Sequence, residues 1–138
     1  MSTAGRPSAL AQPLRRPSAG RAAAYLGLFV LGAIVGVAGA LVQSGLFPGG
    51  LLLALAGEAG LCVGGARAAR SRGGAVAPAG GWMLAVILLT ASRPEGDFVF
   101  AAGSGSYLFL LGGMAVAVIC ATLAPGRQPD DDAVRLGK

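Results

Sequence analysis

The sequence predicts an all-α, polytopic membrane protein in which four transmembrane helices form an antiparallel bundle. Three observations carry this prediction: 54% of the residues are hydrophobic, only 12% are charged, and the mean hydropathy is +0.70. A soluble domain normally contains about a quarter charged residues. The charges lie almost entirely outside four long apolar segments, as expected when those segments cross hydrocarbon. The predicted spans cover residues 22–43, 48–66, 75–92 and 106–123.

Residues 1–21 are predicted to form a disordered arm before the first span. They include three prolines and several Ser, Gly and Ala residues, with too little apolar periodicity to bury a face. A secretory signal would place a short basic region directly before a short apolar core, whereas here about twenty mostly polar residues precede a full-length span. We therefore expect residues 22–124 to form the membrane domain and residues 125–138 to form a short tail.

Short connectors and helix-breaking residues set the limits of the other spans. Residues 44–47 alone separate the first two apolar segments, which should therefore form a tight hairpin with Pro48 in the first turn of the second helix. The third segment stops before Pro94.

Trp82 lies deeper than an interfacial residue should if this helix begins at residue 75. Either the helix begins later, or the indole packs inside the bundle with its N–H on a backbone carbonyl.

The positions of the arginines predict the orientation in the membrane. Four arginines precede the first span and three follow the second, whereas the connector between these spans has none. Because cytoplasmic segments are enriched in Lys and Arg, we expect both termini in the cytoplasm and the chain in a bacterial inner (plasma) membrane. This orientation also accounts for the pI of about 10.3, so no nucleic-acid partner is expected. The arginines are Arg6, Arg15, Arg16, Arg21, Arg67, Arg70 and Arg72.

Glu58 is the only formal charge inside the predicted spans. An ionised side chain at the bilayer centre costs about 2.5–3.5 kcal/mol or more, and no Lys, Arg or His lies in any span to pair with it. We expect a largely neutral carboxylic acid that donates a hydrogen bond to Thr90, to a carbonyl freed at a glycine, or to a partner chain. Two interpretations follow: Glu58 joins helices together, or it is a protonatable site for proton or cation coupling.

Small residues at four-residue spacing predict where helices approach closely in lipid. Hydrophobic force between helices is weak there, so association depends on backbone contact that small residues permit. Gly32 and Gly36 form this pattern in the first span, and Gly60 and Gly64 form it in the second. Similar stripes contain Gly81 in the third span and Gly113 in the fourth.

The spans offer no recognisable catalytic arrangement. The chain has no His, and its two cysteines, Cys62 and Cys120, belong to no CxxC motif, which excludes a typical zinc site. We therefore expect no enzyme, no cofactor and no metal, with the cysteines as small packing residues. The favoured role is a non-enzymatic accessory or structural subunit that packs in the lipid bilayer with itself or with another membrane protein. The alternative is a small proton-coupled carrier that uses Glu58.

Four strings of residues carry a resemblance to a known family. They are GVAGALVQ at 36–43, FPGGLLLAL at 47–55, GGW at 80–82 and PEGD at 94–97. Together they resemble the small four-span integral membrane proteins of actinobacteria that are grouped as a family of unknown function. The resemblance covers most of residues 25–123 and implies the same architecture. It implies no catalytic residue.

Overall fold

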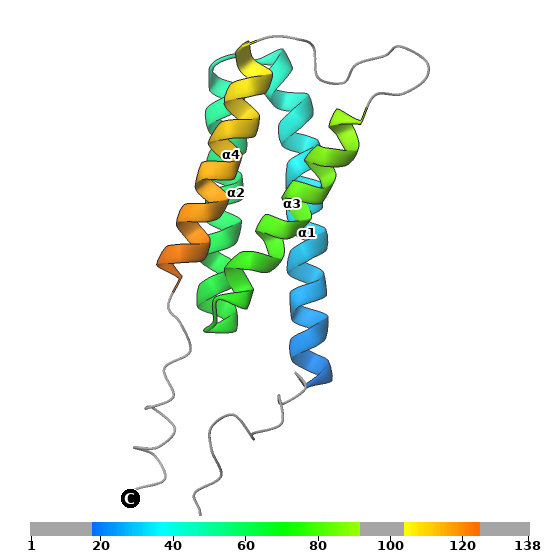
Figure 1. Cartoon of the computed structure of the whole chain (residues 1–138), viewed down its shortest axis with the longest axis vertical. Coiled ribbons are helices and arrows are strands. Elements are labelled where there is room, and N and C mark those ends of the chain that lie inside the picture. The colour runs from blue at the N-terminus through cyan, green and yellow to red at the C-terminus, as the bar shows by residue number, and fades with distance from the viewer. Residues whose placement is uncertain (1–17, 92–103, 125–138) are drawn as a thin grey trace, which may run out of the picture.

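The computed structural model describes residues 18–91 and 104–124, and within them it contains four α-helices and no strand. Each helix is long and apolar enough to span a membrane. Figure 1 shows the helices packed in one bundle, which confirms the predicted all-α fold of four apolar helices. The helices are α1 (Ala19–Gly45), α2 (Gly49–Ala69), α3 (Gly73–Thr90) and α4 (Ser104–Leu123).

The helix limits lie within a few residues of the predicted spans. The first helix begins at Ala19, three residues before the predicted start at residue 22, so the end of the predicted disordered arm is helical. The run Ala22-Ala23-Ala24 favours this extension because Ala is the strongest helix former. The rest of the predicted arm, residues 1–17, and the predicted tail, residues 125–138, lie outside the described residues.

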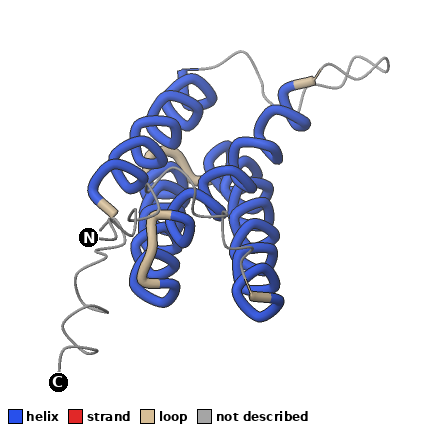
Figure 2. Tube along the Cα trace, turned by 60° about the horizontal axis from the view of Figure 1, so that its bottom comes forward, coloured by secondary structure: helices blue, strands red, loops and turns tan. Residues whose placement is uncertain are grey.

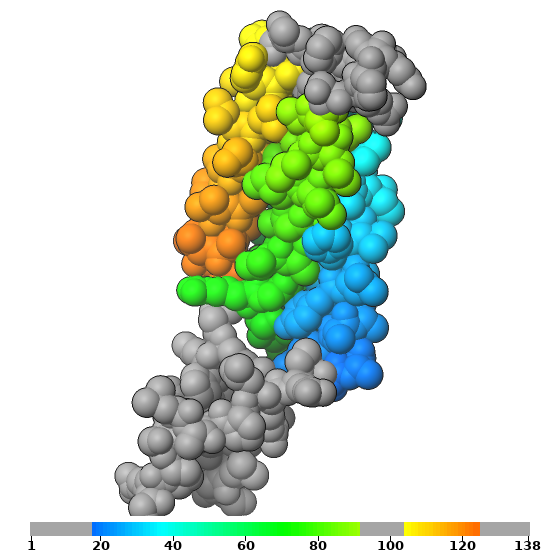
Figure 3. Space-filling view, turned by 45° about the vertical axis from the view of Figure 1, so that its right-hand side comes forward, coloured from blue at the N-terminus to red at the C-terminus, as the bar shows by residue number. Residues whose placement is uncertain are grey.

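Short connections make neighbouring helices antiparallel. Residues 46–48 join α1 to α2, and residues 70–72 join α2 to α3. α3 packs most extensively against α1, and α4 packs mainly against α2. In Figure 1, α3 crosses in front of α1 at an angle, and Figure 2 shows the same bundle turned so that its lower end comes forward. Figure 3 shows one face of the molecule, on which α3 lies between α4 and α1.

Two side-chain hydrogen bonds bring three segments together at one end of the bundle. The hydroxyl oxygens of Tyr25 on α1 and Ser71 in the α2–α3 turn lie 2.7 Å apart. The Nε of Arg72 donates to the carbonyl oxygen of Ala124, just after α4, at 3.3 Å. The start of α1 and the end of α4 therefore lie at the same end, as a four-helix up-and-down bundle requires. All four described arginines, Arg21, Arg67, Arg70 and Arg72, belong to these segments, and we call this end the arginine end.

The core changes character along the bundle. Its largest side chains are Trp82 and Phe109, whose ring centroids lie 5.5 Å apart in a tilted arrangement. They cluster with Ala40, Leu51, Ala54 and Val86 in the part of the bundle away from the arginine end. At the arginine end the buried cluster consists only of alanines, namely Ala66, Ala75 and Ala124. Small side chains there allow α2, α3 and the end of α4 to approach closely.

Candidate functional site

Glu58 lies on the face of α2 that points into the bundle. Its side chain is 2% exposed, and it shares this face with the buried residues Ala54 and Cys62, each one helical turn away. Neither carboxyl oxygen forms a hydrogen bond with any described residue. The hydroxyl of Thr90, one of the expected partners, donates instead to the carbonyl oxygen of Val86 at 2.7 Å. Glu58 is therefore a buried acid without a partner in the described part of the chain.

Trp82 places a second unpartnered polar group near the same depth. Its indole is 1% exposed, and its Nε1 has no hydrogen-bond partner among the described residues. Ala54 and Phe109 belong to one core cluster, and α2 and α4 both run from there toward the arginine end. Glu58 follows Ala54 on α2 by four residues, and Gly113 follows Phe109 on α4 by four residues. Each step is about 6 Å along the helix, in the same direction. Because Gly113 abuts the indole ring of Trp82, Glu58 and Trp82 lie at about one level.

The position of Trp82 settles the two alternatives that the sequence left open. α3 begins at Gly73, earlier than the predicted residue 75, so a late start does not explain the depth of the indole. The indole instead packs inside the bundle, against Gly36 of α1 and Gly113 of α4. Within the described residues, the expected hydrogen bond from the indole N–H to a backbone carbonyl is absent.

The structure brings the two cysteines of the chain together. The side chains of Cys62 on α2 and Cys120 on α4 lie close together, and both cysteines are free. Cys62 is fully buried, and Cys120 is half-buried. Cys62 thus packs as a small core residue, as expected from the sequence. The contact with Cys120 was not predicted, because 58 residues separate the two positions and no local pattern links them.

Gly32 and Gly36 lie where α1 crosses α3. A Cβ atom on Gly32 would overlap the backbone carbonyl of Pro78, and one on Gly81 would overlap the backbone carbonyl of Phe29. A Cβ atom on Gly36 would lie 3.2 Å from both the Ala85 Cβ and the Trp82 carbonyl oxygen. The α1 and α3 backbones therefore meet directly. The structure places the predicted stripe of the first span in a helix contact, together with Gly81 of the third.

Gly60 and Gly64 do not pack within this bundle, so their predicted role as contacts between helices of one chain is wrong for the described residues. Both are exposed, and a Cβ atom on either would meet no described atom within 4 Å. The reason is helical geometry. Gly60 lies two residues from both Glu58 and Cys62, which is about 200° around the helix at about 100° per residue. Once Glu58 points inward, Gly60 must point outward.

Other glycines make the close contacts of α2. A Cβ atom on Gly65 would overlap the backbone carbonyl of Gly74 on α3, and a Cβ atom on Gly74 would overlap the backbone carbonyl of Gly65. A Cβ atom on Gly50 would overlap the backbone carbonyl of Val42 on α1. Gly65 follows Glu58 by seven residues, which is two helical turns along the same face. This spacing from the buried acid is the sequence feature that identifies the packed face of α2.

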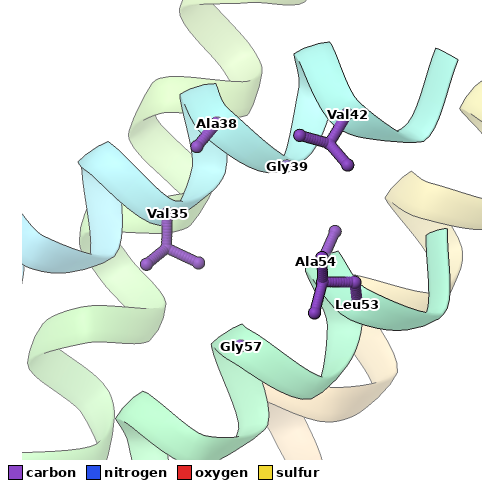
Figure 4. A pocket seen from close by; sticks show the side chains of 7 residues that line it. All are labelled: Val35, Ala38, Gly39, Val42, Leu53, Ala54 and Gly57. Carbon is purple, nitrogen blue, oxygen red and sulfur yellow. The ribbon is translucent and has the colours of Figure 1, made fainter. Parts of the chain in front are cut away.

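Grooves open on the surface between helices, and two of them involve α2. One lies between α1 and α2, has a volume of about 160 Å³ and is apolar. Figure 4 shows Val35 and Val42 of α1 and Leu53 of α2 around it, with Gly39 and Gly57 also in its lining. Gly39 lies opposite Ala54, and the nearest side chain to Gly57 is that of Val35. The other lies between α2 and α4 and has a volume of about 300 Å³; it is lined by Val63, Ala66, Arg67, Ile119, Cys120, Leu123 and Ala124. Neither groove is lined by Glu58.

Comparison with known proteins assigns the chain to a family. No curated protein and no solved structure shows significant similarity to it. The model of a family of unknown function, DUF6113, matches residues 8–137, which covers nearly the whole sequence and all four helices. The chain therefore belongs to the family of unknown function DUF6113.

Proposed function

We propose that this protein is a non-enzymatic accessory or structural subunit of a bacterial inner membrane, and that it packs there with a second copy of itself. The observation that carries the proposal is the outward face of α2. Ala56, Gly60 and Gly64 recur at four-residue spacing and are exposed from the bundle. In lipid, such small residues permit close approach of a neighbouring helix.

The neighbouring surface supports the same interpretation. Gly57 borders the outward face of α2 and also lines the apolar groove between α1 and α2. Leu53, one turn before Gly57, is 66% exposed and lines the groove as well. A helix placed on Gly60 and Gly64 would therefore find an apolar depression beside it for its own side chains. The proposed orientation puts the arginine end in the cytoplasm, in line with the excess of basic residues there.

Cross-linking in the native membrane tests the proposed packing. In a chain whose two cysteines are replaced by Ala, Gly60→Cys is expected to give a covalent dimer under mild oxidation, because two copies would meet at this face. Val118→Cys is the matched control, since Val118 is 61% exposed on α4 and lies outside the proposed contact. A non-reducing gel measures the dimer. Equal yields at the two positions, or no dimer at Gly60, would refute self-association through α2.

A cross-linked product of another mass would identify a different membrane protein as the partner. The accessory role would then hold and the homodimer would not. Gly60→Leu combined with Gly64→Leu should dissociate the complex while leaving the melting temperature of the monomer nearly unchanged. The monomer is spared because both positions are exposed, and a Cβ atom at either would meet no atom of another described helix within 4 Å.

Glu58 favours a second candidate function, a small proton-coupled carrier. A carboxyl group that is 2% exposed and has no described hydrogen-bond partner is costly, and intramembrane acids often take part in proton coupling. Proton release by such a group requires a path that a second copy or a conformational change would supply. This candidate is therefore compatible with the same oligomer as the first, with a transport activity added.

Glu58→Gln distinguishes the two candidates. The amide has nearly the shape of the acid and loses no hydrogen bond to a described residue, so the free energy of unfolding should change by less than about 1 kcal/mol. In a structural subunit, dimer formation should also persist. A carrier reconstituted in liposomes should dissipate a pH gradient when its substrate is added, and Glu58→Gln should abolish that flux. Unfolding of Glu58→Gln would contradict the placement of an unpartnered acid at this position.

A further inference from the structure

The groove between α2 and α4 has the composition of a site for an amphiphilic ligand. Its walls come from Val63 and Ala66 on one side and from Ile119 and Leu123 on the other. Its volume of about 300 Å³ lies at the lower end of the range for small-molecule sites. Arg67, in the last turn of α2, is the charged residue of the lining. The groove therefore joins an apolar wall to one cationic group.

The groove lies at the arginine end of the bundle, where α2 and α4 end. Arg67 is close to the C-terminal end of α2, and Ala124 at the opposite wall directly follows α4. Arg72 is engaged nearby through its hydrogen bond to the Ala124 carbonyl. Arg67 forms no ion pair within the described residues, where Glu58 is the one acid, and Glu58 lies nine residues away, which is about 13 Å along α2. An exposed arginine thus borders an apolar groove at the end of a candidate membrane span, where lipid headgroups are expected to lie.

We propose that this groove binds an anionic phospholipid from the leaflet at the arginine end. One acyl chain lies along the apolar walls, and the headgroup phosphate accepts hydrogen bonds from the Arg67 guanidinium. Guanidinium groups match phosphate oxygens in geometry and charge. Basic pockets between transmembrane helices bind anionic headgroups for the same reason. A soluble anion would gain the phosphate contact but not the contact with the apolar walls.

A segment of the chain itself is the competing occupant. Asp130, Asp131 and Asp132 begin six residues after Ala124, and six extended residues reach about 20 Å. Their carboxylates could pair with the same guanidinium and close the groove to lipid. The test therefore includes a chain in which all three aspartates are replaced by Asn.

Native mass spectrometry of protein extracted from mixed vesicles of phosphatidylcholine and phosphatidylglycerol tests the proposal. The wild-type chain is expected to retain one phosphatidylglycerol in preference to phosphatidylcholine. Arg67→Gln should reduce this preference at least about tenfold, because a charge-assisted contact is lost. Arg70→Gln is the matched control: it removes one exposed positive charge from the same end, at a residue outside the groove lining, and should leave the preference unchanged.

The apolar wall is tested separately. Ile119 is 52% exposed and lines the groove, so Ile119→Trp should fill it and lower lipid retention without changing any charge. Cys120, also in the lining, provides a second measurement in vesicles. Its modification by N-ethylmaleimide should be slower with phosphatidylglycerol present than in phosphatidylcholine alone, and Arg67→Gln should remove the difference. Melting temperatures in phosphatidylcholine establish that each variant is folded.

Three results would overturn the proposal. Equal retention of the two lipids by the wild-type chain would show that the groove does not select charge. Equal losses in Arg67→Gln and Arg70→Gln would assign the effect to overall charge rather than to the groove. Selective lipid binding that appears only when the three tail aspartates are replaced would show that the tail occupies Arg67 in the native chain.

Discussion

Trp82→Ala is expected to lower the free energy of unfolding by about 3 kcal/mol, near the lower end of the range for removal of a buried aromatic side chain. The indole is 1% exposed and packs between Gly36 and Gly113, beside the ring of Phe109. In lipid, little of this loss comes from transfer out of water. It comes from lost contacts and from the cavity that remains between three helices. Unfolding in mixed micelles with increasing SDS measures the change.

Leu88→Ala is the matched control for the loss at Trp82. Leu88 lies on the same helix and is 65% exposed. Its replacement by Ala also removes a large apolar side chain, but it should change the free energy of unfolding little. Trp82→Phe should cost less than Trp82→Ala, because it keeps a ring beside Phe109 and its lost N–H has no described partner. Equal stability of Trp82→Ala and Leu88→Ala would contradict the position of the indole in the core.

The sequence predicted the fold because length and hydropathy determine membrane spans almost independently of tertiary structure. Each predicted span corresponds to one observed helix, and the short connector before Pro48 correctly indicated a hairpin. Helix ends were less predictable. The residues before residue 22 are compatible with both a helix and a loop, so the sequence alone did not place the start of α1 at Ala19.

The packed face of α2 was predicted incorrectly for a physical reason. Lipid tails and the protein core are both apolar, so a transmembrane helix has no polar face to mark its outside. The four-residue spacing of small residues in α2 predicted a contact at Gly60 and Gly64, but the spacing does not show which face of the helix points into the bundle. The one residue that distinguishes the faces is Glu58, because an acid in hydrocarbon points into the bundle. Counting two turns from Glu58 gives Gly65, the observed contact.

The candidate sites depend on contacts between distant segments, which a single sequence does not specify. Two features require the position of α4 relative to α2: the proximity of Cys62 to Cys120, and the groove that Arg67 and Leu123 both line. Glu58 was identified from the sequence because its charge is unusual in a span. Its neighbours were not, and the expected contact with Thr90 was replaced by a bond within α3.

Gly32→Ala is expected to destabilise the protein by roughly 1–3 kcal/mol although it adds only one methyl group. The added Cβ atom would overlap the backbone carbonyl of Pro78, and a backbone cannot move aside as a flexible side chain can. α1 and α3 would therefore have to separate at their crossing, and the contact of Gly81 with the Phe29 carbonyl would be lost with it. Thermal melting in detergent measures the loss.

Gly27→Ala isolates this packing effect from helix propensity. Gly27 lies on the same helix, one to two turns before Gly32, and a Cβ atom there would meet no described atom within 4 Å. Both substitutions replace Gly with Ala inside α1, so both gain the same intrinsic helix preference of about 1 kcal/mol. Gly27→Ala should therefore be neutral or slightly stabilising while Gly32→Ala melts earlier. If the two variants melted together, the backbones of α1 and α3 could not be in direct contact, and small residues would not determine how this bundle packs.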